Sequence, residues 1–190
     1  APAPCSPLRD KSIPCPCANT QGGCRFPVLK PLLPARIQHM RPGALPRAVG
    51  RVVLRRLELA DLRRFQAYRH DRVVGRFQGW EPQPHAEATP FIEEMSQADL
   101  FPPGTWFQLG IASGSTNELV GDVGICIRAD DRRAEIGFTV AREAQGRGVG
   151  TEAVRGLIDF IFEHTTVTAV VAVTDQRNIP AGRSLARVGM

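Results

Sequence analysis

Long hydrophobic runs are missing from this sequence of 190 residues. It contains no apolar stretch of the roughly 20 residues that a membrane-spanning helix needs. The N-terminus also lacks the basic start and continuous apolar stretch that are typical of a signal peptide. These absences argue against a membrane protein and predict a soluble protein of the cytoplasm.

Metal-binding motifs are absent as well. The helical H-E-x-x-H pattern does not occur, and Cys5, Cys15, Cys17 and Cys24 lack the paired C-x-x-C spacing that holds a tetrahedral zinc ion. We therefore predict no metal. The fifth cysteine, Cys126, lies in an apolar stretch without a nearby histidine, which favours a buried small residue over a nucleophile.

The positive charge of the chain is confined to its first quarter. Residues 1–49 hold seven of the 24 Lys and Arg and one of the 19 acidic residues, together with ten of the sixteen prolines. They show no helical or strand period, so we predict a disordered, basic leader rich in Pro and Cys. Because Phe26 is the only aromatic residue there, we predict no nucleic-acid partner.

The second part, residues 50–190, has the periodicities of one mixed α/β domain. Short polar turns separate three apolar stretches that predict an antiparallel meander, and amphipathic helical stretches lie on both sides of it. The predicted strands are 52–57, 106–112, 119–128, 134–140 and 167–174. The predicted helices are 59–69, 86–100, a helix beginning at 149, and 178–188.

A glycine-rich loop, Gln145–Gly150, lies between the strand 134–140 and the helix that begins at 149. Glycines let several backbone N–H groups converge, and the N-terminus of a helix adds unsatisfied amides and a positive dipole end. This combination favours an anion such as a diphosphate, with Arg142 and Arg147 placed for added contacts. A Walker loop is excluded by the missing Gly-Lys-Ser/Thr, and the G-x-G-x-G spacing argues against a Rossmann loop.

Four motifs in order resemble the GNAT acetyltransferases. Gln145-x-x-Gly148-x-Gly150 resembles their Q/R-x-x-G-x-G/A loop, and the segments 134–138, 174–178 and 185–190 resemble the branch that includes ribosomal-protein N-terminal acetyltransferases. The similarity covers about residues 51–190. It implies an α/β (α+β) fold with a mixed, mostly antiparallel twisted sheet flanked by helices.

The resemblance also implies acetyl-CoA as the co-substrate. The backbone amides of the loop would hold its diphosphate, the main chain at the end of strand 134–140 would pair with the pantetheine arm, and Asn178 would donate a hydrogen bond to that arm. An alternative for Asn178 is the N-cap of the last helix. The implied cofactor residues are Phe138, Thr139, Val140, Gln145, Gly146, Arg147, Gly148, Val149, Gly150 and Asn178.

For the chemistry, the resemblance assigns Glu135 as the candidate base that accepts the amine proton; the alternative is a solvated surface glutamate. Many relatives place a tyrosine where this chain has Leu185, and often a serine where it has Ala181. The acid that protonates the leaving thiolate would then be Ser184, a water molecule or a group in a missing segment.

The implied acceptor is an amine of a small molecule or of a protein N-terminus. The segment with Arg76, Phe77, Trp80 and His85 corresponds to the region that shapes the acceptor pocket in relatives. A catalytically silent CoA-binding or interaction module is the alternative function.

The chain ends at Met190, whereas relatives continue with a β-hairpin. We therefore expect a domain that is incomplete at its C-terminus, with its final hairpin missing and with weak turnover. Strand 167–174 would expose an unpaired apolar edge, and such an edge favours pairing with another chain, for example in a homodimer.

Overall fold

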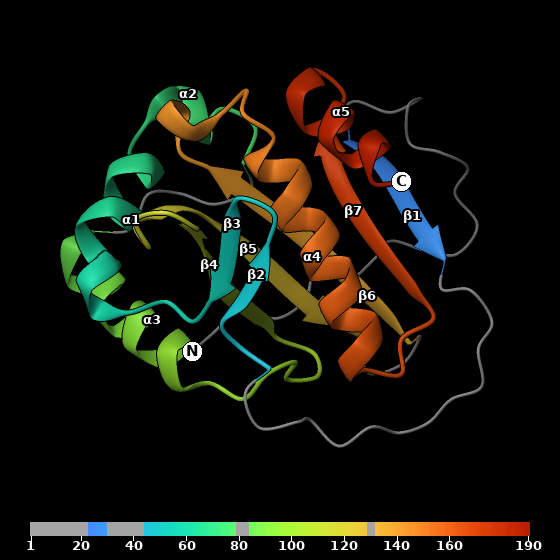
Figure 1. Cartoon of the computed structure of the whole chain (residues 1–190), viewed down its shortest axis with the longest axis horizontal. Coiled ribbons are helices and arrows are strands. Elements are labelled where there is room, and N and C mark those ends of the chain that lie inside the picture. The colour runs from blue at the N-terminus through green and yellow to red at the C-terminus, as the bar shows by residue number, and fades with distance from the viewer. Residues whose placement is uncertain (1–22, 30–43, 79–83, 129–131) are drawn as a thin grey trace.

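The computed structural model describes residues 23–29, 44–78, 84–128 and 132–190, and in these residues one seven-stranded sheet has the order β1-β7-β6-β5-β4-β3-β2 (Figure 1). Neighbouring strands are antiparallel except for the parallel pair of β6 and β7. This confirms the predicted fold, including the meander of β4, β5 and β6. The strands are β1 Gly23–Leu29, β2 Arg47–Val49, β3 Val52–Arg55, β4 Trp106–Ser113, β5 Leu119–Ile127, β6 Arg133–Val140 and β7 Ala169–Asp175.

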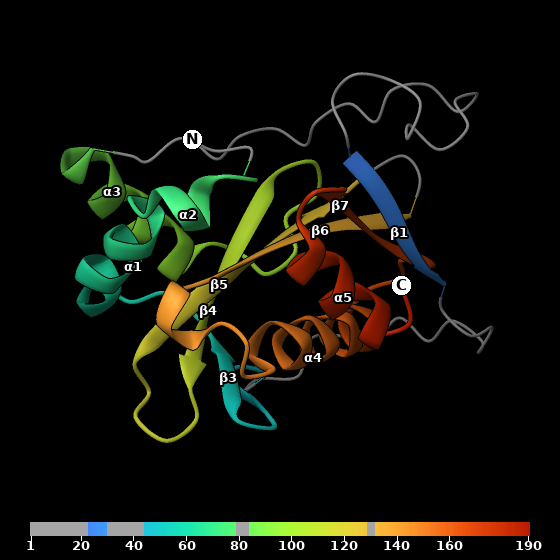
Figure 2. The same ribbon diagram turned by 90° about the horizontal axis from the view of Figure 1, so that it is seen from above.

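Helices cover the sheet on both faces. The crossover helix α4 and the C-terminal helix α5 lie on one side, and α1, α2 and α3 gather at the opposite side (Figures 1 and 2). The α-helices are α1 Leu62–Arg69, α2 Arg72–Gly75, α3 His85–Gln97, α4 Val149–His164 and α5 Ile179–Arg187, and the 3-10 helices are η2 Leu59–Asp61 and η3 Arg142–Ala144.

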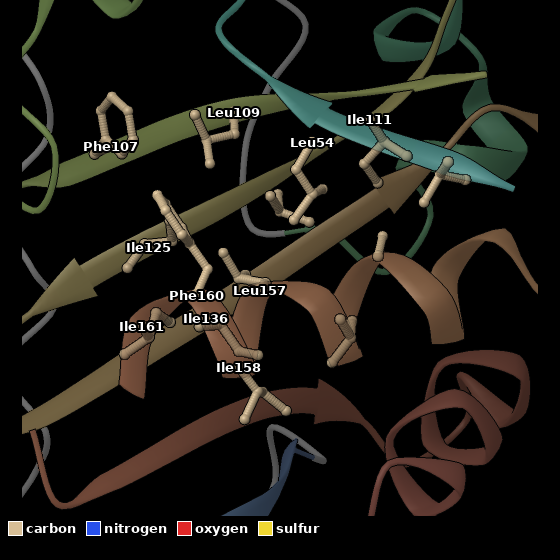
Figure 3. Close-up of a cluster of buried hydrophobic side chains, with 14 of the residues drawn as sticks. Leu54, Phe107, Leu109, Ile111, Ile125, Ile136, Leu157, Ile158, Phe160 and Ile161 are labelled. Atoms are coloured by element: carbon tan, nitrogen blue, oxygen red, sulfur yellow. The ribbon is translucent and has the colours of Figure 1, made fainter. Parts of the chain in front are cut away.

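A large part of the core lies between α4 and the sheet. Alternate residues of β4 and β5, such as Phe107, Leu109 and Ile125, point toward α4, as strand geometry requires (Figure 3). Helix α4 presents Leu157 and Phe160 to them at helical spacing, and all five side chains are almost completely buried. The helix that carries the glycine loop at its start is therefore fixed to the sheet along its length.

Two segments of the predicted leader, 23–29 and 47–49, form strands, which corrects the expectation of disorder for these residues. Strand β1 pairs along the outer edge of β7, from Gly23 opposite Asp175 to Leu29 opposite Ala169. The expected unpaired edge of the strand predicted at 167–174 is therefore wrong, because backbone groups of β1 satisfy it. Strand β2 pairs with β3. Cys5, Cys15 and Cys17 lie outside the described residues.

Within the described residues, no helix combines the length and apolar character needed to cross a membrane. The same part of the chain has no cluster of three or more His, Cys, Asp or Glu side chains that could hold a metal ion.

Candidate active site

The parallel strands β6 and β7 separate halfway along their length. Their register runs over four pairs, from Arg133 opposite Ala169 to Ile136 opposite Ala172, and then stops. Both strands continue beyond that point, β6 paired with β5 as far as Val140 and β7 paired with β1 as far as Asp175. The main chain of residues 137–140 is therefore unpaired on the side of β7.

The glycine loop lies at the end of β6, beside this separation. η3 leads into Gln145, and Gly146 and Gly148 adopt positive φ angles of 73° and 83°. Gly148 is the N-cap of α4, and residues 145–148 are exposed. The left-handed backbone requires glycine at both positions, because other L-residues are strained there.

The backbone amides of this loop are available to a ligand. In the region that the structure describes, the N–H groups of residues 146–151 have no backbone acceptor, whereas the N–H of Glu152 donates to the carbonyl of Gly148 at 3.0 Å. Helix geometry leaves the first N–H groups of α4 without partners, and their partial positive charge suits an anion. The loop therefore has the open amides that the sequence predicts for a diphosphate site.

Two side chains of the loop region have structural partners. Gln145 Nε2 donates to the carbonyl of Val140 at 2.8 Å, which ties the loop back to the end of β6. Arg142 donates to Asp71 at 2.6 Å, and this interaction, as the largest cause, lowers the pKa of the Asp71 carboxyl. The guanidinium of Arg142 is engaged in an exposed ion pair with the residue that caps α2, and its contact with a phosphate stays a prediction.

Gly150 has a packing role in addition to its backbone N–H. A Cβ at this position would lie 3.2 Å from a ring carbon of Phe138 and 3.5 Å from a methyl of Val140. The first turn of α4 therefore rests directly on the end of β6. This close approach holds the helix N-terminus beside the unpaired main chain of that strand.

The other face of β6 carries Glu135, Gly137 and Thr139, which alternate with the residues facing α4. Glu135 is partly buried and lies opposite Val171, within the paired part of β6 and β7. Gly137 lies opposite Gly124 of β5, and a Cβ on Gly137 would meet nothing within 4 Å. Gly137 therefore leaves a strip of β6 without a side chain where β6 begins to separate from β7, whereas the Trp106 ring covers Gly124, 3.2 Å from where a Cβ would lie.

A buried polar cluster borders the strip. Tyr68 of α1 donates through its hydroxyl to Asp122 at 2.6 Å, and Arg69 donates to the same carboxylate at 2.9 Å and to Gln108 at 3.1 Å. Burial, together with the negative charge of Asp122, raises the pKa of Tyr68 well above its ordinary value, so the hydroxyl stays protonated and acts as a donor. The cluster fixes α1 on the sheet, because Tyr68 and Arg69 belong to α1 and Asp122 belongs to β5.

Helix α2 connects the two sides of the separation. At its start, Asp71 pairs with Arg142, just beyond β6. Beyond its end, the ring of Phe77 lies 5.8 Å from the guanidinium carbon of Arg177, which follows β7 and pairs with Asp175 at 2.7 Å. The side-chain hydrogen bonds from Arg177 are the main reason why the pKa of Asp175 is lowered to about 2. Of the other residues expected near the acceptor, Trp80 lies outside the described residues.

The residues expected from α5 have mixed outcomes. Asn178 caps the helix, since its Oδ1 accepts from the N–H of Ala181 at 3.3 Å, which is the alternative weighed for it. Ser184 is partly buried in α5. Leu185 is fully buried in the core and takes no part in the site. A role of Ser184 in proton transfer stays a prediction.

Cys126 is fully buried in β5 and is disulfide-bonded. A nucleophilic cysteine needs an accessible thiolate, and Cys126 has neither access nor a free thiol. This agrees with the prediction that Cys126 is not a nucleophile.

Sequence reasoning missed the contacts behind the loop. Arg51, in the turn between β2 and β3, donates to the carbonyl of Arg147 at 2.8 Å and to Glu152 at 2.8 Å. The available signal was Gly50-Arg51 at the end of the predicted leader, because a glycine followed by apolar β-branched residues is typical of a turn before a strand.

A sheet that opens between two strands next to an amide-rich helix N-terminus defines an α/β domain suited to an extended, phosphate-bearing co-substrate. The chain belongs to the GNAT family of acetyltransferases: the family's model, described as "Acetyltransferase (GNAT) domain", matches residues 51–190. A relative, "Uncharacterized N-acetyltransferase p20" of Bacillus licheniformis, is 29% identical over 133 residues, which cover 69% of this chain and 74% of that protein. The chain is accordingly an acetyltransferase.

Solved structures share the fold. Mycobacterium smegmatis RimJ in complex with CoA-disulfide has a TM-score of 0.61 at 20% identity, with 77% of this chain and 76% of that chain covered. Spermidine N-acetyltransferase from Vibrio cholerae in complex with CoA and spermine has a TM-score of 0.62 at 20% identity, with 73% and 80% covered. At these identities the likeness concerns the fold alone.

Proposed function

We propose that this protein transfers an acetyl group from acetyl-CoA to a primary amine by direct attack. The observation that carries the proposal is the separation of β6 from β7 directly beside the open amides of residues 146–151. Two solved structures with the same fold are complexes with CoA-disulfide and with CoA, which supports the choice of co-substrate.

The dimensions of β6 support an extended ligand. A strand rises about 3.3 Å per residue, so the unpaired main chain of residues 137–140 offers roughly 13 Å of backbone donors and acceptors. Phe138, Thr139 and Val140 would pair through their main chain with the amides of the pantetheine arm, in the manner of an added strand. The loop Gln145–Gly150 at the end of β6 would hold the diphosphate.

Glu135 is the proposed base, because it lies two residues before Gly137, where β6 is no longer paired with β7. This separation corresponds to about 7 Å along the strand, and a base can accept the amine proton either directly or through one water molecule. Bound acetyl-CoA supplies a thioester that is open to attack by a neutral amine. A backbone N–H near residues 138–140 would donate to its carbonyl oxygen, and Ser184 or water would protonate the leaving thiolate.

The strip at Gly137 is the proposed approach route of the acceptor. It lies on the face of β6 that also carries Glu135, and open space surrounds Gly137. The acceptor class is a primary amine, either of a small polyamine-like molecule or of a protein N-terminus. The spermidine N-acetyltransferase with the same fold supports the first class. The resemblance of the motifs to ribosomal-protein N-terminal acetyltransferases supports the second class.

A catalytically silent CoA-binding module is the second candidate. It is favoured by the buried Leu185 at the position where many relatives have tyrosine. One experiment separates the two functions: CoA binding by calorimetry, together with thiol release from acetyl-CoA in the presence of polyamines and of peptides with free N-termini. Amine-dependent thiol release that is lost in Glu135→Gln, with CoA affinity retained, supports the enzyme. Binding without thiol release supports the silent module, and absence of binding contradicts both.

A further inference from the structure

The turn between β2 and β3 makes three hydrogen bonds behind the cofactor loop. Arg51 Nη1 donates to the carbonyl oxygen of Arg147 at 2.8 Å. Arg51 Nε donates to Glu152 Oε1 at 2.8 Å, and the backbone N–H of Arg51 donates to Glu152 Oε2 at 2.7 Å. Both carboxylate oxygens are engaged, so the hairpin, the loop and the first turn of α4 are joined by one pair of side chains.

Gly50 is adapted to this contact. It has a φ of +58°, and a Cβ built on it would lie 2.5 Å from Glu152 Oε2. Glycine is thus required twice, for the left-handed backbone and for the close approach of the carboxylate. The turn is shaped around the side chain of Glu152.

The bond to Arg147 has a consequence for the neighbouring amide. In a trans peptide the C=O of Arg147 and the N–H of Gly148 lie in one plane and point in opposite directions. Gly146 and Gly148 flank Arg147 with positive φ angles, and glycine permits many other orientations of the peptide between them. By holding the carbonyl toward the hairpin, Arg51 directs the N–H of Gly148 away from the hairpin.

We infer that Arg51 and Glu152 are positioning residues for diphosphate binding. Arg51 orients the Gly148 amide, and Glu152 holds Arg51 in place. The inference rests on the proposed function, because it assigns the loop to the diphosphate of CoA. The competing explanation is a direct contact between Arg51 and the phosphates. The two explanations predict opposite changes in CoA affinity when the side chain of Glu152 is removed.

The sign follows from simple electrostatics. A carboxylate near a diphosphate repels it, so charge alone predicts that removing Glu152 strengthens CoA binding. If Glu152 acts by holding Arg51, its removal weakens CoA binding although a negative charge is lost. Glu152→Ala therefore separates positioning from direct charge attraction.

The chain offers a matched control on the same two elements. Arg47 of β2 donates to both carboxylate oxygens of Glu163 in α4, at 2.6 and 2.8 Å. With a rise of about 1.5 Å per residue, Glu163 lies roughly 16 Å from Glu152 along the helix. Arg47→Ala removes a comparable ion pair between hairpin and helix without contact to the loop.

The test measures CoA and pantetheine affinity of the 190-residue chain by calorimetry, with thermal unfolding to check the fold. We expect Arg51→Ala, Glu152→Ala and Gly50→Ala each to weaken CoA binding about tenfold, the effect of one charge-assisted hydrogen bond. Pantetheine, which has no diphosphate, should bind these variants like the wild type. Arg47→Ala should lower the melting temperature and leave CoA affinity unchanged.

Glu152→Gln adds a conservative variant that stays informative if Glu152→Ala does not fold. It keeps an oxygen that accepts from Arg51, so positioning predicts CoA affinity between those of the wild type and Glu152→Ala. Equal or tighter CoA binding by Glu152→Ala or Glu152→Gln than by the wild type overturns the inference and leaves the proposed function intact. Failure of the wild type to bind CoA overturns the proposed function itself.

Discussion

Gly137 provides a test in which stability and activity should change in opposite directions. It lies in the interior of β6, opposite Gly124, and a Cβ on it would meet nothing within 4 Å. Glycine in a strand is destabilising by roughly 0.5–1 kcal/mol relative to alanine, and β-branched residues favour strands further. Gly137→Val should therefore raise the free energy of unfolding by about 1 kcal/mol.

The same substitution should abolish turnover. The valine side chain would fill the strip on the face of Glu135, along the proposed route of the amine, without altering the main-chain edge of residues 137–140. A displacement of the attacking nitrogen by about 1 Å costs on the order of 100-fold in rate. We expect kcat/KM for the amine to fall at least that much, while the Kd for CoA stays within about twofold of the wild type.

The assays are urea unfolding, calorimetry with CoA, and amine-dependent release of free thiol. Gly182→Ala is the matched control, because Gly182 lies in α5, its added Cβ also meets nothing within 4 Å, and alanine stabilises a helix by about 1 kcal/mol relative to glycine. The control should gain stability and keep wild-type turnover. Wild-type turnover by Gly137→Val would refute the assignment of this face to the acceptor.

Three further predictions concern the framework of the site. Asp61→Ala leaves Arg55 buried without its bidentate partner, which lies at 2.7 and 2.8 Å, and should cost about 3–5 kcal/mol in urea unfolding without changing CoA affinity. The interaction with Arg177 lowers the pKa of Asp175 to about 2, from an ordinary value near 4. Because the folded-state pKa is lowered, this interaction stabilises the fold above pH 4, and the stabilisation is lost as the pH falls toward 2. Asp175→Asn should accordingly reduce the loss of stability over that interval in acid-unfolding curves, and an unchanged curve would contradict the ion pair. Deleting residues 1–43 removes β1 and exposes the edge of β7, so size-exclusion chromatography should detect self-association that the full chain does not show.

Local patterns explain why much of the domain could be predicted. The strands β4, β5 and β6 alternate apolar and polar residues between short polar turns, and α4 repeats its apolar residues at helical spacing. These signals come from neighbours in sequence, and they are sufficient for the meander, the crossover helix and the position of the loop between them. The loop glycines also have the left-handed conformations that make glycine necessary there.

The elements that escaped prediction depend on distant partners. Strand β1 contains a proline and has no alternating pattern; it forms by backbone pairing with β7, about 150 residues away in sequence. Helix α2 is only four residues long, too short for a period, and is capped by Asp71, whose carboxylate is also paired with Arg142. The hydrogen bonds of Arg51 to Arg147 and Glu152 likewise join segments about 100 residues apart.

The separation of β6 and β7 connects the two halves of the site. Residues 137–140 remain paired with β5 and residues 173–175 remain paired with β1, so both segments stay strands after they part. In a parallel pair, the crossover helix must begin near the C-terminal end of the first strand, so the open amides of α4 lie where β6 has lost its pairing with β7. One topological feature thus provides both an unpaired backbone and a positive helix end, which are the two parts of the proposed CoA site. A change that restores pairing between β6 and β7 beyond Ile136 should therefore weaken CoA binding even with every loop residue intact. The reason is that CoA would need both the unpaired backbone of β6 and the amides of the loop.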